Sequence, residues 1–372
     1  MKFLKIIFFF FFLIFFDFLF IFFFKNLFPS QKLFYSNYWR IPSSIYHHDL
    51  LANISVNEKW GSDTYLLVTN SIGFRDYENK NIKKINQDQK RILVLGDSFT
   101  EGLINYEDSF VGLLQKKYKN KYEILNGGVG SYSPTNYYYK FKHYIENGYK
   151  FDRVIIFLDV SDIVDETRYN YDIKNNLILK ENFSKNNDYI NSLKNYSIIF
   201  KSISFLRDQF KYIKNYIRYK YRAAKAFNKN FFEISHADIK FYRMINNEIG
   251  LWTENINEAR YNLKTVNIGI KRAEMNLLRI SKLAQMNNCE FTLIIYPWPT
   301  QVYFGDKIHS SYWENFANTN DIKFINLYDA ILDKKKEAKD IIMDNYIHGD
   351  IHFNKKGNIK IFNHLIKKLE GF

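Results

Sequence analysis

Short apolar runs alternate with amphipathic stretches through most of the chain. Five of these runs have the length and composition of buried strands, at residues 91–95, 122–125, 153–158, 291–296 and 322–327. Apolar residues recur at helical spacing between and after them, at residues 107–118, 136–147, 267–286 and 356–369. Buried strands that alternate with helices are typical of a parallel sheet covered on both faces. The pattern therefore predicts an α/β fold over residues 91–372.

Two other segments interrupt this alternation. Residues 30–90 show no long periodic run, and we expect them to form an N-terminal extension that packs on the α/β core. Residues 167–265 separate the third and fourth strands by more than a plain loop needs. Within them, residues 200–227 carry Lys, Arg and Tyr at helical spacing. This stretch predicts a helical insertion, either solvated and packed over the core or lying as a basic helix on anionic lipid.

The N-terminal region holds the longest apolar run of the chain. Residues 6–24 contain 12 Phe, six Leu or Ile and one acid, Asp17. A helix of that length spans about 28 Å, which is enough for a bilayer core. The apolar residues favour insertion by roughly 0.3–0.6 kcal/mol each, which outweighs about 3 kcal/mol for one central carboxylate. We therefore predict a transmembrane helix within residues 1–29.

The flanks of this run predict its orientation. Lys2 and Lys5 precede it while only Lys25 follows closely, so the positive-inside rule keeps the N-terminus in the cytoplasm. A cleaved signal peptide would end in small residues of the Ala-x-Ala kind, and none follows Phe24. We expect an uncleaved, single-pass signal anchor, with the rest of the chain on the periplasmic or extracellular side of the cell membrane.

Composition narrows the range of partners. The chain has 53 Lys and Arg against 39 Asp and Glu, a formal charge of +14, which suits nucleic acid or anionic lipid. Export would remove nucleic acid, and the sequence holds no recognition motif, so we expect no nucleic-acid partner. An apolar fraction of 47% excludes wholesale disorder. The single cysteine, Cys289, excludes an internal disulfide and a cysteine-based structural zinc site.

Polar residues follow several of the predicted strands. In open α/β sheets, ligands bind at the carboxyl ends of the strands. The segments there are Gly96-Asp97-Ser98 after the first strand, 126–133 after the second and Asp159-Val160-Ser161-Asp162 after the third. Asp350-Ile351-His352 comes just before the last predicted helix. A serine at a strand-to-helix turn, glycine-rich amides and a histidine with a nearby carboxylate are the parts of a serine acyl-transfer site.

Two of these segments resemble blocks of a known family. Leu93-Val94-Leu95-Gly96-Asp97-Ser98-Phe99-Thr100 resembles the first block of the SGNH (GDSL-type) hydrolases, and Asp350-Ile351-His352-Phe353-Asn354 with Gly357 resembles the last. The resemblance covers roughly residues 90–165 and 267–372. It implies a flavodoxin-like three-layer α/β/α sandwich with no metal or cofactor. It also implies that Ser98 is the nucleophile, His352 the general base, and Asp350 the residue that orients His352.

The same resemblance implies an oxyanion hole, with departures from the family's pattern. The backbone amide of Ser98 would supply one donor, and the second block would supply another at Gly130 or at Ser131, where a glycine is usual. In the third block Ser161 stands where the family has an asparagine that donates to the oxyanion. The carboxylate of the last block precedes His352 by two residues, where three is commoner.

These observations predict a membrane-anchored, exported serine esterase or O-acyltransferase. The expected substrates are ester groups, above all O-acetyl groups, of cell-surface or exopolysaccharide glycans, and the expected intermediate is an acyl-serine. The sequence leaves hydrolysis and transfer open. One alternative is a non-catalytic protein that binds or assembles glycans and keeps the fold. Another is a lipid-active esterase, which the aromatic, basic insertion would suit.

Overall fold

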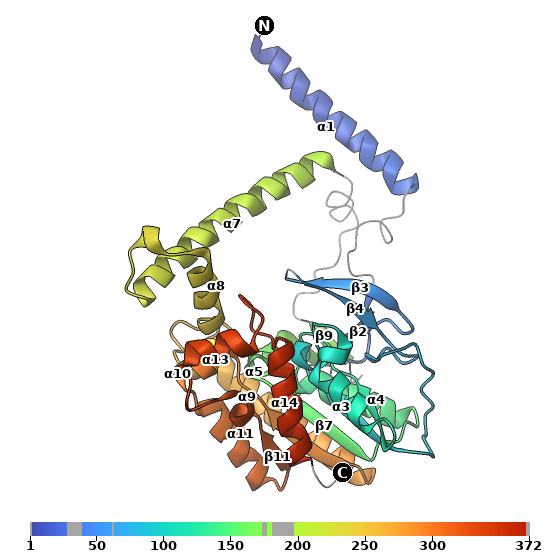
Figure 1. The fold of residues 1–372 in the computed structure, drawn as a ribbon. Helices are drawn as coiled ribbons and strands as arrows, with labels where there is room; N and C mark the ends of the chain where they lie inside the picture. The colour runs from blue at the N-terminus through green and yellow to red at the C-terminus, as the bar shows by residue number, and fades with distance from the viewer. Residues whose placement is uncertain (1, 28–38, 62, 173–176, 181–196, 370–372) are drawn as a thin grey trace. The chain divides into compact units, whose positions relative to one another are not determined.

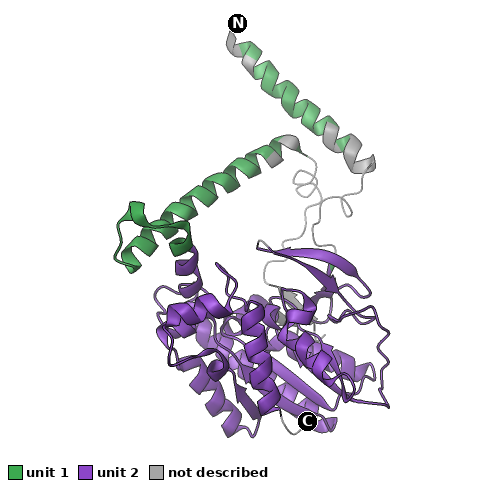
Figure 2. Cartoon of the chain, in the orientation of Figure 1, with its two compact units in different colours: residues 1–39, 182–239 green, residues 40–181, 240–372 purple. Residues whose placement is uncertain are grey.

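The chain forms two compact units. The computed structural model describes residues 2–27, 39–61, 63–172, 177–180 and 197–369. Unit 1 holds residues 1–39 and 182–239, and unit 2 holds residues 40–181 and 240–372 (Figure 2). The α/β core and the segment before it thus share unit 2. Most of the predicted insertion belongs instead to unit 1, together with the N-terminal helix.

Unit 2 is built on a five-stranded parallel sheet with the order β11-β10-β7-β5-β6. Figure 1 labels the central strand β7 and the edge strand β11 of this sheet. The strands are β5 (Lys90–Leu95), β6 (Tyr122–Asn126), β7 (Arg153–Leu158), β10 (Glu290–Ile295) and β11 (Lys323–Asn326). From the β6 edge, this is the 2-1-3-4-5 order of flavodoxin-like folds. Every residue of the central β7 is buried. The predicted α/β fold with a parallel five-stranded sheet is confirmed.

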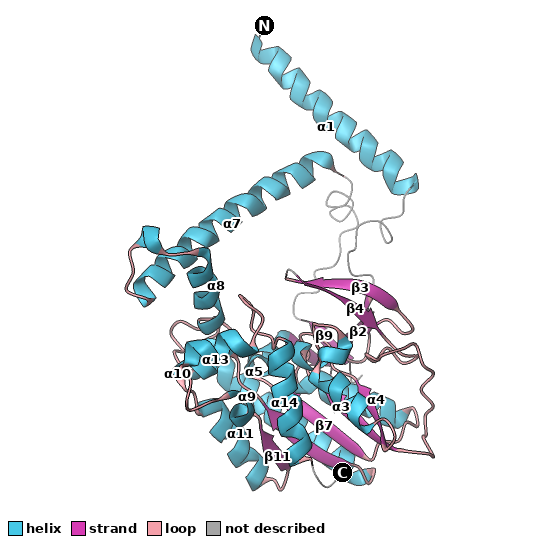
Figure 3. Ribbon diagram, viewed as in Figure 1, coloured by secondary structure: helices cyan, strands magenta, loops and turns pink. Residues whose placement is uncertain are grey.

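Helices cover the sheet in two layers (Figure 3). The connections from β5 to β6 and from β6 to β7 cross the sheet in opposite directions, so right-handed crossovers put their helices, α3 and α4, on opposite faces. α3 packs beside α14, and α4 packs beside α9. The helices of unit 2 are α2 (Ser98–Glu101), α3 (Phe110–Tyr118), α4 (Pro134–Glu146), α5 (Val160–Asp165), α9 (Leu263–Met286), α10 (Pro299–Phe304), α11 (Ile308–Thr319), α12 (Tyr328–Ile331), α13 (Ala338–Asn345) and α14 (Lys355–Lys368), with 3₁₀ turns at Tyr106–Asp108, Glu166–Arg168 and Gly250–Thr253.

Short antiparallel hairpins precede the sheet. β1 (Arg40–Ser43) pairs with β2 (His47–Leu50), and β3 (Ser55–Trp60) pairs with β4 (Asp63–Val68). A further hairpin, β8 (Tyr169–Asp172) with β9 (Leu177–Lys180), follows α5. A buried ion pair of 2.8 Å between Lys140 Nζ of α4 and Asp49 of β2 ties the N-terminal hairpins to the core. These strands are short and mixed in polarity, so the sequence pattern did not predict them.

Unit 1 is helical where the structure describes it. α1 (Lys2–Leu27) covers the predicted apolar run, and α7 (Ile198–Ala226) covers the predicted basic helix. A 3₁₀ turn (Phe231–Glu233) and the start of α8 (His236–Ile245) follow. Asp17, the one acid of the apolar run, accepts a hydrogen bond from the hydroxyl of Ser197, the N-cap residue of α7. The prediction of helices at both places is confirmed.

The predicted membrane span receives no support from the structure. Within the described ranges, no helix combines the length and the apolar character that crossing a bilayer requires.

Candidate active site

Ser98 stands at the turn between β5 and α2. The Asp97 side chain caps α2 by accepting a hydrogen bond of 2.9 Å from the amide of Phe99. A Cβ at Gly96 would lie 2.0 Å from Oγ1 of Thr100, so only glycine lets the chain turn this tightly here. The turn therefore holds Ser98 as the first residue of α2, at the carboxyl end of the sheet.

The structure brings Ser98 together with His352 and Asp350. Ser98 Oγ lies 2.8 Å from His352 Nε2, and His352 Nδ1 lies 2.5 Å from Asp350 Oδ1. The backbone amide of His352 donates to the same carboxylate oxygen, at 2.9 Å. The spacing of two residues thus suffices, because one turn of chain presents both donors of His352 to Asp350. Asn354 caps the helix that follows, α14, by accepting from the amide of Gly357.

The electrostatics of this group favour an ionised Asp350. Burial alone would raise the pKa of its carboxyl, but the hydrogen bonds and the charge of His352, with help from Trp60, outweigh burial and lower that pKa. A carboxylate at Asp350 favours the His352 tautomer that carries its proton on Nδ1. His352 Nε2 is then free to accept the proton of Ser98.

Trp60 is a site residue that the sequence pattern missed. Its Nε1–H donates to Asp350 Oδ2 at 3.1 Å, and its ring meets the His352 ring edge-on at 5.2 Å. Phe99 contacts the same imidazole, with ring centroids 4.6 Å apart. Trp60 ends β3, in the segment that showed no periodic signal, and lies 290 positions from Asp350. A tryptophan closing the mostly polar strand Ser55–Trp60 was the only trace of this role.

We expect Trp60→Phe to lower kcat/KM by about tenfold, since a hydrogen bond to a charged group is lost while the side chain stays aromatic. Loss of this donor raises the pKa of Asp350, and activity requires the carboxylate, so the acid side of the pH–rate profile moves to higher pH. Trp313→Phe in α11 is the matched control and should leave the profile unchanged. An unaltered profile in Trp60→Phe would show that the indole N–H has no part in positioning Asp350.

The Gly130 amide does not serve the predicted oxyanion hole. It donates to Oε2 of Glu101 at 2.7 Å, because the Glu101 side chain folds back from α2 onto this turn. On its other side, His48 Nε2 lies 2.9 Å from the carbonyl oxygen of Gly130. Burial lowers the pKa of His48 to about 4, so its ring is neutral and donates there. Both backbone polar groups of Gly130, its N–H and its carbonyl, therefore have hydrogen-bond partners.

Ser98 and Ser131 keep the backbone donors that the prediction assigned to them. Among the described residues, the amides of Ser98 and Ser131 have no hydrogen-bond acceptor. A Cβ built on Gly130 would lie 3.6 Å from the Cβ of Ser98, so the turn that carries Ser131 borders the serine. The φ of Ser131 is 65°, a left-handed conformation that turns the chain sharply at this point.

The Ser161 hydroxyl is not available as the oxyanion donor that the resemblance implied. Its hydroxyl donates to Asp159 Oδ1 at 2.8 Å, and its amide donates to the same oxygen at 2.7 Å. Asp159 is the N-cap of α5, so Ser161 completes a helix cap and does not present a free donor. The short serine side chain reaches back to the cap, and the third block consequently contributes no side-chain oxyanion donor.

This placement predicts a small effect for Ser161→Ala. We expect kcat to change by less than about tenfold, whereas loss of an oxyanion donor costs about 10²–10³. Initial rates of p-nitrophenyl acetate hydrolysis by both proteins would measure the change. A fall of two or three orders of magnitude would return the Ser161 hydroxyl to the oxyanion hole.

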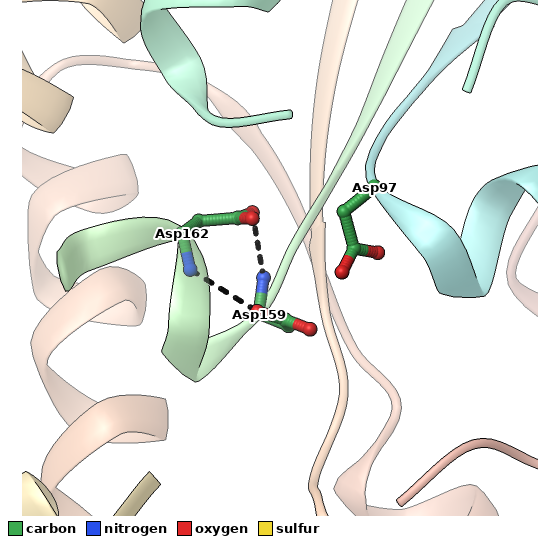
Figure 4. A group of neighbouring side chains, drawn as sticks. All are labelled: Asp97, Asp159 and Asp162. Carbon is green, nitrogen blue, oxygen red and sulfur yellow. Dashed lines mark hydrogen bonds between the residues drawn. The ribbon is translucent and has the colours of Figure 1, made fainter. Parts of the chain in front are cut away.

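Three buried aspartates brace the strand ends beneath Ser98. One oxygen from each of Asp97, Asp159 and Asp162 lies within 4.8 Å of the others (Figure 4). Burial first, and then the neighbouring Asp159 charge, raise the pKa of both Asp97 and Asp162 well above the ordinary value. Trp298 Nε1 donates to Asp159 at 2.8 Å, and the Tyr296 hydroxyl donates to Asp97 at 3.0 Å. The cluster thus links the ends of β5, β7 and β10 through buried hydrogen bonds.

A second buried network joins the N-terminal hairpins to the turn beside Ser98. Arg40 of β1 contacts both oxygens of Glu101, at 2.6 and 3.0 Å, and Glu58 of β3 at 3.1 Å. Burial would raise the pKa of Glu101, but Arg40 and the Gly130 amide outweigh it and lower that pKa. The Glu101 carboxylate is therefore charged. It binds Arg40 and also accepts from the Gly130 amide, so it links β1 to the turn beside Ser98.

Comparison with known proteins gives similarity to solved structures only. No family model and no curated protein matches the chain. It is similar to a member of the lipolytic protein G-D-S-L family from Veillonella parvula DSM 2008, with 12% identity, a TM-score of 0.40, and coverage of 76% of this chain and 100% of that one. It is also similar to a GDSL-like lipase from Bacteroides thetaiotaomicron VPI-5482, with 14% identity, a TM-score of 0.38, and coverage of 78% of this chain and 92% of that one. Similarity to an acetyl xylan esterase from Geobacillus stearothermophilus amounts to 11% identity and a TM-score of 0.37, with coverage of 77% of this chain and 96% of that one. The fold and the site described above rest on the chain's own strand order and distances.

Proposed function

We propose that the chain is a serine esterase or O-acyltransferase whose nucleophile is Ser98. The observation that carries this proposal is the continuous hydrogen-bonded series from Ser98 Oγ through His352 to Asp350, with distances of 2.8 and 2.5 Å. A serine hydroxyl bonded to an imidazole that a carboxylate orients is the arrangement that activates serine for attack on a carbonyl. The lowered pKa of Asp350 agrees with this role.

In the proposed reaction, His352 Nε2 takes the hydroxyl proton as Ser98 Oγ bonds to the ester carbonyl carbon. The negative charge that forms on the carbonyl oxygen is held by the amides of Ser98 and Ser131. His352 then gives its proton to the departing alkoxide, which leaves an acyl-Ser98. Water or a sugar hydroxyl attacks this ester, transfers its proton to His352, and releases acid or acylated product while Ser98 recovers its proton.

A fluorophosphonate tests for the activated nucleophile. The full chain is treated with the reagent, and intact and peptide masses are recorded. We expect one adduct, on the peptide that carries Ser98, because the phosphonyl group forms its bond to Oγ as fluoride leaves. Absence of an adduct on folded protein would contradict the proposal.

We further propose O-acetyl esters of glycans as the substrate class. The support is the sequence resemblance to the SGNH (GDSL-type) family together with the exported location that the sequence predicts. Acetate release from acetylated xylo-oligosaccharides, compared with hydrolysis of a long-chain p-nitrophenyl ester, separates this class from a lipid-active esterase. Faster turnover of the long-chain ester at a lipid surface would favour the lipid-active alternative.

One observation favours a second candidate, a non-catalytic glycan-binding or assembly protein. Ser161 is committed to the cap of α5, so the third block offers no side-chain oxyanion donor. A protein with this role would keep its biological activity in Ser98→Ala, whereas an esterase or transferase would lose it.

We also propose the location that the sequence predicts, with the N-terminus cytoplasmic and unit 2 on the exported side of the cell membrane. The support is the 19-residue run at 6–24, with 12 Phe and a single acid, and the lysines before it. Protease accessibility of unit 2 in intact and in opened cells tests the side, and alkaline extraction tests the attachment.

A further inference from the structure

Helix α7 carries an apolar stripe beside a basic one. Apolar side chains recur every three or four residues, which places them along one line of the helix: Ile199, Ile203, Leu206, Phe210, Ile213 and Ile217. Basic side chains recur with the same rhythm, one position after most of the apolar ones and so about 100° around the axis: Arg207, Lys211, Lys214, Arg218, Arg222 and Lys225. The helix has eight basic residues and one acid, Asp208.

The apolar stripe is open along most of its length. The side chains from Ile203 to Ile217 are between 52% and 72% exposed within the described residues. Towards the C-terminal end the helix packs on the 3₁₀ turn Phe231–Glu233, and Ala223 and Ala224 are buried there. The six basic residues of the neighbouring stripe are all exposed. Both ends of α7 thus contact their own unit, with α1 at the N-terminal cap and the 3₁₀ turn at the C-terminal end. The middle of the helix presents an uncovered apolar face flanked by positive charge.

We propose that this face of α7 lies on the surface of an anionic lipid layer. Five large apolar side chains in water are unfavourable, and the acyl boundary of a lipid layer would cover them. The adjacent row of Lys and Arg then meets the negative headgroups, which adds attraction for each charge. A second copy of α7 fits less well, because it would bring two strongly positive helices together.

The rest of unit 1 agrees with this placement. Described phenylalanines of α1, such as Phe8 and Phe11, are about two-thirds exposed or more, so both long helices of the unit carry apolar side chains that the described residues leave uncovered. The lipid surface concerns α7 alone and holds whether or not unit 2 is an esterase.

Site-specific labelling of the full chain tests the proposal. The label sits on α7, so its quenching reports the environment of α7 and not that of α1. Ile213→Cys places an environment-sensitive fluorophore on the apolar stripe. Asn215→Cys, two residues on and about 200° around the helix, is the matched control. Cys289 can stay, because burial raises the pKa of its thiol to about 12 and the thiol is inert at neutral pH. Vesicles contain phosphatidylglycerol and phosphatidylcholine in equal parts, with a nitroxide quencher on the acyl chains.

We expect severalfold stronger quenching at position 213 than at position 215 in these vesicles. The triple variant Arg207→Gln, Lys211→Gln and Lys214→Gln should weaken partitioning of α7 by roughly 100-fold, at about fivefold per charge. The triple variant Lys116→Gln, Lys117→Gln and Lys119→Gln removes the same charge from exposed positions around α3 and should leave quenching unchanged.

Three results would overturn the proposal. Equal quenching at positions 213 and 215 would mean that the stripe does not face lipid. Equal quenching in pure phosphatidylcholine vesicles would mean that anionic headgroups are not what α7 recognises. Protection of the label at position 213 without vesicles, growing with protein concentration, would assign the face to a second copy of the chain.

Discussion

Ser98→Ala is expected to lower kcat for p-nitrophenyl acetate by at least about 10⁴, and to abolish the fluorophosphonate adduct. Removal of the nucleophile from a serine–histidine–aspartate group leaves only the residual rate from oxyanion donors and binding. Stability should hardly change, because the Ser98 hydroxyl contacts only His352 and Asp97 among the described residues. Steady-state rates and the free energy of unfolding in urea, measured on the same preparations, check both statements.

Two controls make this result specific. Ser311→Ala, at an exposed position in α11, should keep both the rate and the adduct. His352→Gln should lose nearly as much activity as Ser98→Ala, and the double variant little more, because the two residues act as one unit. Losses that multiply in the double variant would mean that Ser98 and His352 act independently, and the proposed mechanism would fail.

Local patterns in the sequence were enough to predict the sheet and to single out Ser98, His352 and Asp350, which the structure brings together. A buried strand needs a run of apolar residues whatever its neighbours are, so β5, β7 and β10 were recognisable. Ser98 and His352 were found because each lies in a short motif next to a predicted element. The strand order then brings the two motifs together at the carboxyl edge of the sheet.

The differences between the predicted and the observed site come from hydrogen-bond partners, one of them local in the chain and the others distant. The Gly130 amide was assigned to the oxyanion from its place in a glycine-rich loop, but Glu101, 29 residues earlier, occupies it. Ser161 was assigned from its alignment with an asparagine, but its side chain follows the local geometry of the α5 cap. Trp60 and Arg40 come from hairpins whose short, mixed strands give no periodic signal. A local sequence pattern does not predict which distant side chain will accept the hydrogen bond of a given backbone amide.

These missed residues share one property, which is that the N-terminal hairpins supply them. Trp60 donates to Oδ2 of Asp350, and His48 donates to the carbonyl oxygen of Gly130. Arg40 acts on Gly130 only through Glu101, and all three residues precede the first strand of the sheet. The hairpins are therefore part of the site's construction. A fragment that begins at β5 would lack three of the contacts that hold its active groups.

Arg40→Met should lower the free energy of unfolding by about 3 kcal/mol at neutral pH, because it leaves the buried Glu101 carboxylate without its main partner. Glu101 is 0% exposed, and Arg40 only partly exposed, so solvent replaces little of the lost interaction. The pH dependence has a definite sign. In the wild type the pKa of Glu101 is lowered, so its stabilisation is lost as pH falls. In Arg40→Met only the Gly130 amide and Arg75 still oppose burial, so the pKa of Glu101 rises, and the deficit should be larger at pH 7 than in acid.

The double variant Arg40→Met with Glu101→Gln separates charge from packing. Glutamine is neutral and its side-chain oxygen can still accept from the Gly130 amide, so we expect the double variant to recover most of the stability and its pH dependence to vanish. Arg168→Met is the control for loss of a more exposed arginine, 38% exposed and paired with Asp165, and should cost less than about 1 kcal/mol.

Urea unfolding across pH, with ester hydrolysis rates alongside, measures both effects. If the single and double variants are equally destabilised at every pH, Arg40 acts through packing, and the charge link from β1 through Glu101 to the turn beside Ser98 is wrong. If the single variant also loses activity and the double variant regains it, the position of the Gly130–Ser131 turn, and with it the oxyanion donor, depends on that charge link.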